Sequence, residues 1–112
     1  MYSTRAALLG ALLIAVTPPA SADAWHEGLV KMVYPLGDGS FALGFEAPIP
    51  GCSSSGLIRY VHVVPSQNGV TVDGAKSMLG TVLTAFAMGT TVAVAFNDTT
   101  NYCYVNRLYI KP

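Results

Sequence analysis

The chain has 112 residues, and its 6 basic and 6 acidic side chains give a formal net charge of zero. Neither sign of charge gathers in one stretch, so we expect no nucleic-acid partner, because contacts to phosphates need a basic stripe. The length allows one domain with a modest core and is too short for two.

The N-terminal segment 1–22 has the parts of a secretory signal peptide. Arg5 precedes an apolar run from Ala6 to Val16, and the small residues Ala20-Ser21-Ala22 follow. The run is shorter than the roughly 20 residues that span a bilayer, and the Ala-x-Ala step suits a signal peptidase. A membrane anchor is the alternative. We predict cleavage after this segment, or after Ala24, and a single secreted or periplasmic domain over 23–112 with no membrane span in the mature protein.

Two strands joined by a turn are expected first. Residues 28–34, GLVKMVY, are apolar and rich in β-favouring side chains, and Asp38-Gly39 in the following turn is a strong hairpin signal. The second strand covers 41–46, where aromatic and leucine side chains alternate with small ones, so one face should be buried. Gly44 inside it predicts a bulge or a sharp coil of the sheet.

A loop and a third strand follow. Residues 47–56 form a loop by composition, and the strand over 57–64 ends at Pro65. Alternation places three of its side chains on one face and three on the other. The first set is Arg59, Val61 and Val63, and the second is Tyr60, His62 and Val64.

A single helix is predicted from Asp73 to Gly89. Asp73 is the expected N-cap and Gly89 the expected C-cap. Its predicted apolar face consists of Ala75, Met78, Leu79, Val82, Leu83 and Phe86. The opposite face is small and uncharged after Lys76: Ser77, Gly80, Thr81, Thr84, Ala85 and Met88. Two alternatives stay open for that face: a solvated surface, or a surface covered by another protein or by a second copy, which would make a homo-oligomer through Asp73–Met88.

The remaining strands complete the predicted fold. Thr90–Phe96 is the fourth strand, expected to be central, and Tyr102–Ile110 the fifth. We place Tyr104, Leu108 and Ile110 on one side of the fifth strand, and Cys103, Val105 and Tyr109 on the other. The fold class is therefore mainly β with one helix, in the order β-β-β-α-β-β. This is the order of a five-stranded OB-like, partly open barrel; a small α+β sheet is the alternative.

The two cysteines, Cys52 and Cys103, both follow the signal peptide. In an oxidising compartment we expect a disulfide between them, with two free thiols as the alternative. A metal site is not expected, because His26 and His62 do not complete any zinc-ligand spacing with these cysteines.

The helix and the strand after it, from Ala75 to Phe96, resemble the corresponding passage in B subunits of bacterial AB5 toxins, especially the subtilase-cytotoxin and typhoid-toxin type. The segment is also similar to small secreted bacterial proteins of the same layout. The resemblance implies an OB-fold, a ring of five with helices lining a central channel, and glycan binding at the barrel surface. No sugar-contacting residue of those subunits can be matched to a position here.

The candidate ligand site is a patch on and before the third strand. It comprises Ser53, Ser54, Ser55, Arg59, Tyr60 and His62. Tyrosine suits binding surfaces because its ring is rigid and amphipathic; ordinary sheet packing is the alternative. His62 has no partner that would make it a catalytic base, and no cofactor motif is present.

We therefore expect a non-enzymatic binding module with a glycan or protein partner. The alternative is a monomeric envelope structural or inhibitor-like protein.

Overall fold

The computed structural model describes residues 23–49 and 60–112 and contains five strands and one helix within them. The strands are β1 (Ala24–Pro35), β2 (Phe41–Phe45), β3 (Tyr60–Val63), β4 (Thr91–Phe96) and β5 (Val105–Lys111), and the helix is α2 (Val72–Met88). The strands form one sheet in the order β3-β2-β1-β4-β5, and every neighbouring pair is antiparallel. No helix in this described part is long and apolar enough to cross a membrane.

The long strand β1 holds the sheet together. Its first half, Ala24–Leu29, pairs with β4, and its second half, Val30–Pro35, pairs with β2. The register shifts between Val30 and Met32, which leaves Lys31 as an extra residue, and such a bulge bends a strand and increases its twist. The bulge that we expected at Gly44 therefore lies opposite it, in β1. The strand also begins at Ala24, four residues earlier than predicted.

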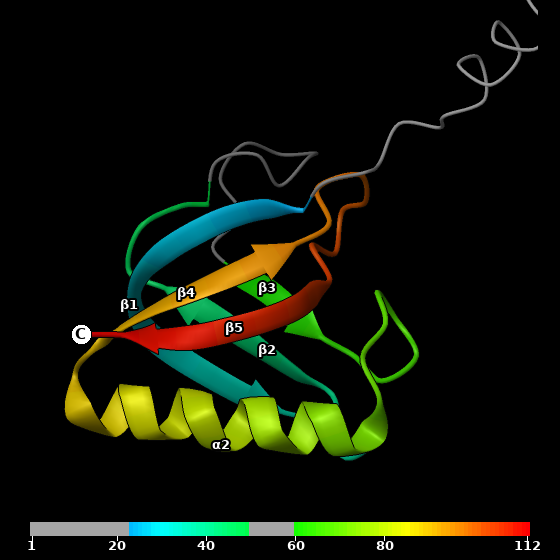
Figure 1. The fold of residues 1–112 in the computed structure, drawn as a ribbon, viewed down its shortest axis with the longest axis horizontal. Coiled ribbons are helices and arrows are strands. Elements are labelled where there is room, and N and C mark those ends of the chain that lie inside the picture. The colour runs from blue at the N-terminus through cyan, green and yellow to red at the C-terminus, as the bar shows by residue number, and fades with distance from the viewer. Residues whose placement is uncertain (1–22, 50–59) are drawn as a thin grey trace, which may run out of the picture.

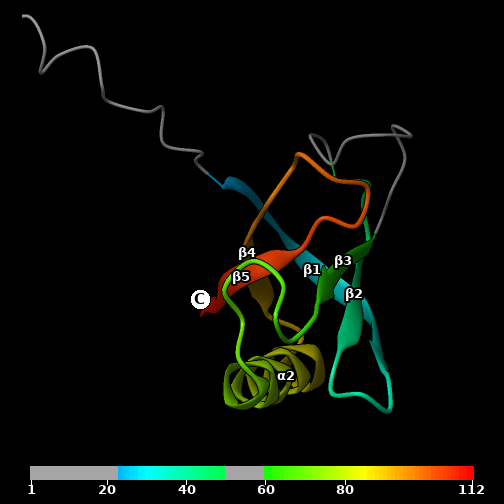
Figure 2. The same cartoon turned by 90° about the vertical axis from the view of Figure 1, so that its right-hand side faces the viewer.

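The two edge strands meet and nearly close the sheet. His62 of β3 and Tyr104, just before β5, form a parallel bridge, and the His62 amide donates to the Cys103 carbonyl at 3.2 Å. Below this bridge Asn68 spans the gap: its side chain donates to the Tyr104 carbonyl at 2.9 Å, and its own carbonyl accepts from the Asn106 side chain at 2.6 Å. This closure confirms the predicted OB-like, partly open barrel (Figures 1 and 2).

Helix α2 lies across one end of the curled sheet (Figure 1). The Thr71 side chain accepts from the Gly74 amide at 3.0 Å, so Thr71 is the N-cap and our assignment of Asp73 is wrong. Thr71 has the extended backbone that an N-cap needs, whereas Asp73 is already in the first turn, where it still complements the helix dipole. Gly89 ends the helix in the left-handed conformation at φ 69°, as predicted.

The buried side of the helix is narrower than the predicted apolar face. Ala75, Val82 and Ala85 are buried, and Met78 and Leu79 are partly buried against the core. Leu83 and Phe86 are exposed, which corrects their assignment to the buried face, and Ala85 lies inside rather than outside. A helix that covers the end of a barrel contacts it along one strip only, so part of a wide apolar face stays outside.

The core fills the barrel between the strands and the helix. Its largest fully buried side chains are Phe41, Leu43, Ile49, Val61, Val63, Val82, Val92, Val94, Phe96, Cys103 and Val105. In β2 Phe41, Leu43 and Phe45 belong to the core, as the predicted alternation requires, and the two residues between them are buried as well. The outward-facing positions of β2 are Ala42 and Gly44, which larger neighbours cover. The fourth strand is likewise buried from Val92 to Phe96, and it lies next to the central strand β1.

The fifth strand begins at Val105, three residues later than predicted. Ala95 pairs with Arg107 but Phe96 pairs with Val105, so the strand carries a bulge at Asn106. The extra residue reverses the alternation: Val105 is buried, while Tyr109 is exposed. The predicted common face of Val105 and Tyr109 is therefore wrong.

Candidate functional site

Strand β3 presents two of the predicted site residues on the outside of the barrel. Val61 and Val63 point into the core, so Tyr60 and His62 point outward, as the alternation predicted. The Tyr60 side chain is 45% exposed. The other predicted members, Ser53, Ser54, Ser55 and Arg59, lie outside the described residues, as does Cys52. The disulfide from Cys52 to the fully buried Cys103 therefore stays a prediction.

The closure of the barrel brings two more tyrosines to His62. The ring of His62 lies edge-on to Tyr102, with centroids 6.1 Å apart, and Tyr102 stacks on Tyr104 at 5.5 Å and 19°. Cys103, between the two tyrosines, points into the core with a positive φ of 49°. We call Tyr60, His62, Tyr102 and Tyr104 the tyrosine–histidine cluster. Tyr102, at the tip of this surface, is 57% exposed.

One hydrogen bond fixes the tautomer of His62. Its Nδ1 lies 2.7 Å from the Tyr102 carbonyl oxygen. A carbonyl can only accept, so Nδ1 must carry the hydrogen, and in the neutral ring Nε2 is then an acceptor. The same contact holds the imidazole ring in place against the loop that carries Tyr102. The cluster therefore contains a preset hydrogen-bond acceptor beside exposed aromatic rings.

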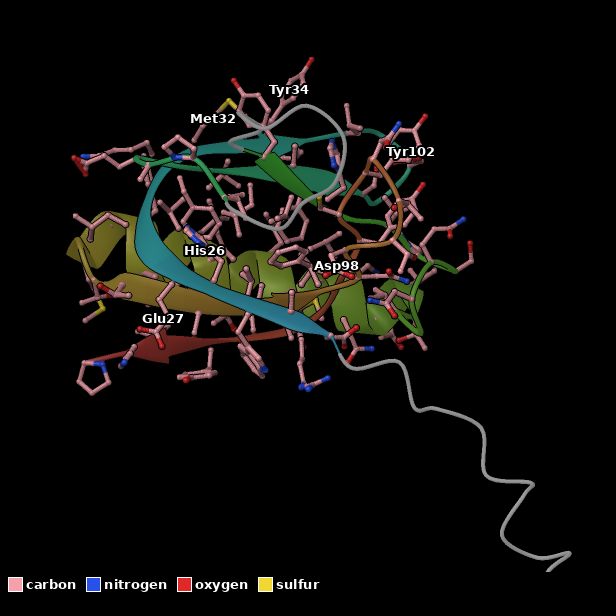
Figure 3. All side chains as sticks on the ribbon, turned by 90° about the horizontal axis from the view of Figure 1, so that it is seen from above. His26, Glu27, Met32, Tyr34, Asp98 and Tyr102 are labelled. Carbon is pink, nitrogen blue, oxygen red and sulfur yellow. The ribbon has the colours of Figure 1, made fainter. Side chains whose placement is uncertain are left out.

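Beside the cluster, strand β2 has only small residues, Ala42 and Gly44, on the outside of the barrel. Tyr60 pairs with Gly44, and His62 with Ala42; on the other side of β2 these positions pair with Met32 and Tyr34. Figure 3 shows Met32 and Tyr34 pointing outward on the side of the molecule opposite β5. A Cβ atom at position 44 would lie only 3.1 Å from the Met32 Cβ and 3.2 Å from the Tyr60 ring. Glycine is required here by the close approach of these two side chains.

This surface is open, so a ligand would lie against it and would not be enclosed in a pocket. The described residues contain neither an enclosed pocket nor a group of three His, Cys, Asp or Glu side chains that could hold a metal ion. What they offer is aromatic rings with hydroxyl groups and one oriented imidazole. An arrangement of this kind can bind a ligand that lies on the outside of the barrel.

Sequence reasoning found Tyr60 and His62 by strand alternation, but it did not join them to Tyr102 and Tyr104. The latter lie about 40 positions later and reach His62 only through the closure of the barrel. It also missed Met32 and Tyr34, which the bulge in β1 aligns with Gly44 and Ala42. The abundance of tyrosine was a signal for a binding surface, but it did not show which tyrosines meet.

His26 is a second histidine with an unusual environment. It points from β1 toward the interior, on the opposite side of the strand from Glu27 (Figure 3), and its ring packs edge-on to Phe45 at 4.7 Å. Its buried Nε2 has no hydrogen-bond partner among the described residues. Burial lowers the pKa of the His26 imidazole, and the neighbouring Glu27 carboxylate opposes this shift. The ring is thus held neutral, in a place where a charge would be costly.

Comparison of the chain with protein-family models, with curated proteins and with solved structures finds no match.

Proposed function

We propose that this protein is a secreted or periplasmic non-enzymatic binding domain whose ligand is a glycan, bound on the tyrosine–histidine cluster. The observation that carries the proposal is the pair of exposed rings of Tyr60 and Tyr102 beside His62, with the partly buried Tyr104 stacked on Tyr102. Buried tyrosines would need no function beyond packing. Two of these rings, however, expose about half of their surface on an open face of the barrel.

The chemistry of the cluster matches a sugar. The flat apolar faces of tyrosine rings pack against the C–H face of a pyranose, and their hydroxyl groups donate to and accept from sugar hydroxyls. His62 adds an acceptor at Nε2, and its ring is already held in position by the bond to Tyr102. Small-molecule sites are usually concave and enclosed. The open form of this surface suits a sugar presented on a larger chain or on a cell surface.

The test is binding of soluble, monovalent glycans, chosen from an array, to the purified protein and its variants. Tyr102→Ala and Tyr60→Ala should each weaken binding by on the order of tenfold, which corresponds to the roughly 1.4 kcal/mol expected for one aromatic contact. Tyr109→Ala is the matched control, because Tyr109 is equally exposed but lies on the β5 side of the barrel. Unchanged affinity in both cluster variants would reject the site.

The alternative is a monomeric structural or inhibitor-like protein of the cell envelope. It is favoured by the same open, tyrosine-rich surface, because tyrosine is enriched in protein interfaces and often supplies their hot spots. A protein ligand would leave a glycan array negative. In that case the cluster variants should instead lose affinity for a protein partner.

The homo-oligomer contact through Asp73–Met88 stays a prediction, as does the toxin B-subunit resemblance that suggested it. Residues 77–89 contain no charged side chain, and Leu83, Phe86 and Met88 on the helix are all exposed. An uncharged helix surface with exposed large apolar side chains supports a covering partner there.

A further inference from the structure

The outer face of strands β1, β4 and β5 carries a second group of exposed side chains. Trp25, Glu27 and Leu29 point outward from β1, and Arg107, Tyr109 and Lys111 point outward from β5. Between them, β4 contributes only Ala95, Ala93 and Thr91 at the paired positions. Figure 1 shows β4 flanked by the two longer strands. We call the six outward side chains of β1 and β5, together with Asp23 just before β1, the ladder face.

The small side chains of β4 allow residues two strands apart to touch. Three diagonal pairs cross β4. Arg107 binds Asp23 at 3.2 Å, Trp25 lies edge-on to Tyr109 at 5.9 Å, and Lys111 binds Glu27 at 2.9 Å. The Arg107 guanidinium also lies 5.1 Å from the centre of the Trp25 ring. These side chains cover Ala93 and Ala95 so well that both are fully buried, although they face outward.

The ladder face has an apolar centre, with acidic side chains on one edge and basic side chains on the other. Trp25 and Tyr109 are 48% and 47% exposed, and Leu29 is exposed beside them. The two acids, Asp23 and Glu27, lie on the β1 side, and the two bases, Arg107 and Lys111, on the β5 side. The face therefore has one negative and one positive edge, with aromatic rings between them. Aromatic residues and arginine are the types enriched in protein interfaces.

A second copy of this chain is the partner that such a face fits. A two-fold axis that runs along β4 in the plane of contact places β1 of one copy over β5 of the other. The acids of each copy then lie over the bases of its partner, while the aromatic rings meet near the axis. An axis across the strands would instead place β1 over β1, with like charges opposed. Within one copy the exposed ion pairs contribute little, but across a contact complementary charges select the partner and its orientation.

We propose that the ladder face is an isologous interface through which two copies of this protein form a dimer, face to face. The contact is self-complementary, as a two-fold axis requires. The contact does not include the tyrosine–histidine cluster, so the dimer can be tested independently of the proposed ligand.

Two charge-reversal variants test the proposal. Asp23→Lys with Glu27→Lys makes the whole face basic, and Arg107→Glu with Lys111→Glu makes it acidic. The wild type should have twice the mass of one chain in light scattering coupled to size exclusion. Each variant alone should have the mass of one chain, because like charges now oppose each other. An equimolar mixture of the two variants should return to the double mass as a mixed dimer, detected by native mass spectrometry.

Glu46→Lys, just after β2, is the control and should keep the dimer mass, because Glu46 is exposed and lies outside the ladder face. Formation of the mixed dimer would itself show that both variants are folded, and far-UV circular dichroism checks each one separately. A wild type that has the mass of one chain would overturn the proposal. So would an assembly that keeps its mass in both variants, which would place the contact elsewhere, or two monomeric variants that do not combine.

Discussion

Replacing Gly44 by alanine tests how closely the strands beside the candidate site approach one another. The added Cβ would lie 3.1 Å from the Met32 Cβ and 3.2 Å from the Cδ1 and Cε1 atoms of Tyr60. The Met32 Cβ is attached directly to the backbone, so it cannot move without the strand, and Tyr60 must give way instead. Overpacking of this kind costs about 1–3 kcal/mol. For a domain of this size, each kcal/mol lowers the melting temperature by about 4–8 °C.

Gly80→Ala is the matched control for Gly44→Ala. It makes the same chemical change on the exposed side of α2, where no heavy atom lies within 4 Å of the added Cβ. Alanine there should raise the free energy of unfolding by up to about 1 kcal/mol, because glycine is a poor helix former. Thermal unfolding followed by circular dichroism should therefore give shifts of opposite sign. A Gly44→Ala variant as stable as the wild type would refute the close approach of Met32 and Tyr60.

Four further substitutions test three features of the fold. His26→Phe keeps a ring against Phe45 but removes the imidazole. Because burial lowers the pKa of His26 below its usual value of about 6.5, the unfolded chain takes up a proton first as the pH falls. The free energy of unfolding of the wild type should therefore fall below about pH 6.5. In thermal melts between about pH 7 and pH 5, the melting temperature of the variant should fall less than that of the wild type. Equal decreases would contradict the burial of His26. Thr71→Ala should lower the free energy of unfolding by about 1 kcal/mol in urea titrations, because the N-cap hydroxyl is lost. An unchanged free energy of unfolding would support Asp73 as the N-cap instead. Val82→Ala should cost about 2–3 kcal/mol, from about 0.8 kcal/mol per buried methyl group and the cavity left behind. Phe86→Ser should cost less, about 1 kcal/mol, since Phe86 is 47% exposed and loses only about half of a full burial. The reverse ranking would restore the predicted helix face.

The order of elements could be predicted because local signals fix it. Asp38-Gly39 marks the first hairpin, Gly89 ends the helix, and alternation in β3 separates Val61 and Val63 from Tyr60 and His62. These signals act over a few residues and depend on backbone conformation and on which side chains need burial. They were sufficient for a barrel-like order of five strands and one helix.

The exact positions of the bulges could not be predicted, and they account for the errors in the faces of the strands. An extra residue at Asn106 turns Val105 inward and Tyr109 outward, although the two share the same parity in the sequence. The bulge at Lys31 similarly decides which β1 side chains lie beside Gly44. A bulge needs no special residue type, because it depends on how two strands align across the sheet.

The exposed part of the helix and the full candidate site are likewise consequences of tertiary structure. The apolar stripe of α2 includes both Val82 and Phe86, and only its position at the end of the barrel decides that Val82 is buried and Phe86 is not. Tyr102 reaches His62 because β3 and β5 approach at the bridge between His62 and Tyr104. Neither relation is contained in a local pattern.

On both outer faces of the barrel, small residues of a middle strand lie beneath larger side chains of the strands beside it. The larger side chains differ between the two faces, which suggests that one face binds a ligand and the other a second copy. Ala42 and Gly44 in β2, and Ala93 and Ala95 in β4, are small and buried beneath larger side chains of the strands on each side. Over β4 those larger side chains pair off into two salt bridges and one aromatic contact. Over β2 they are tyrosines, a methionine and a histidine without such pairing of charges, so hydroxyl groups and rings are available to a ligand. Glu27 of the ladder face and Met32 beside the cluster point to opposite sides of the molecule (Figure 3). A dimer formed through the ladder face would therefore carry its two ligand surfaces on the outside, and two linked sites bind a surface that displays many copies of a sugar far more tightly than one site does.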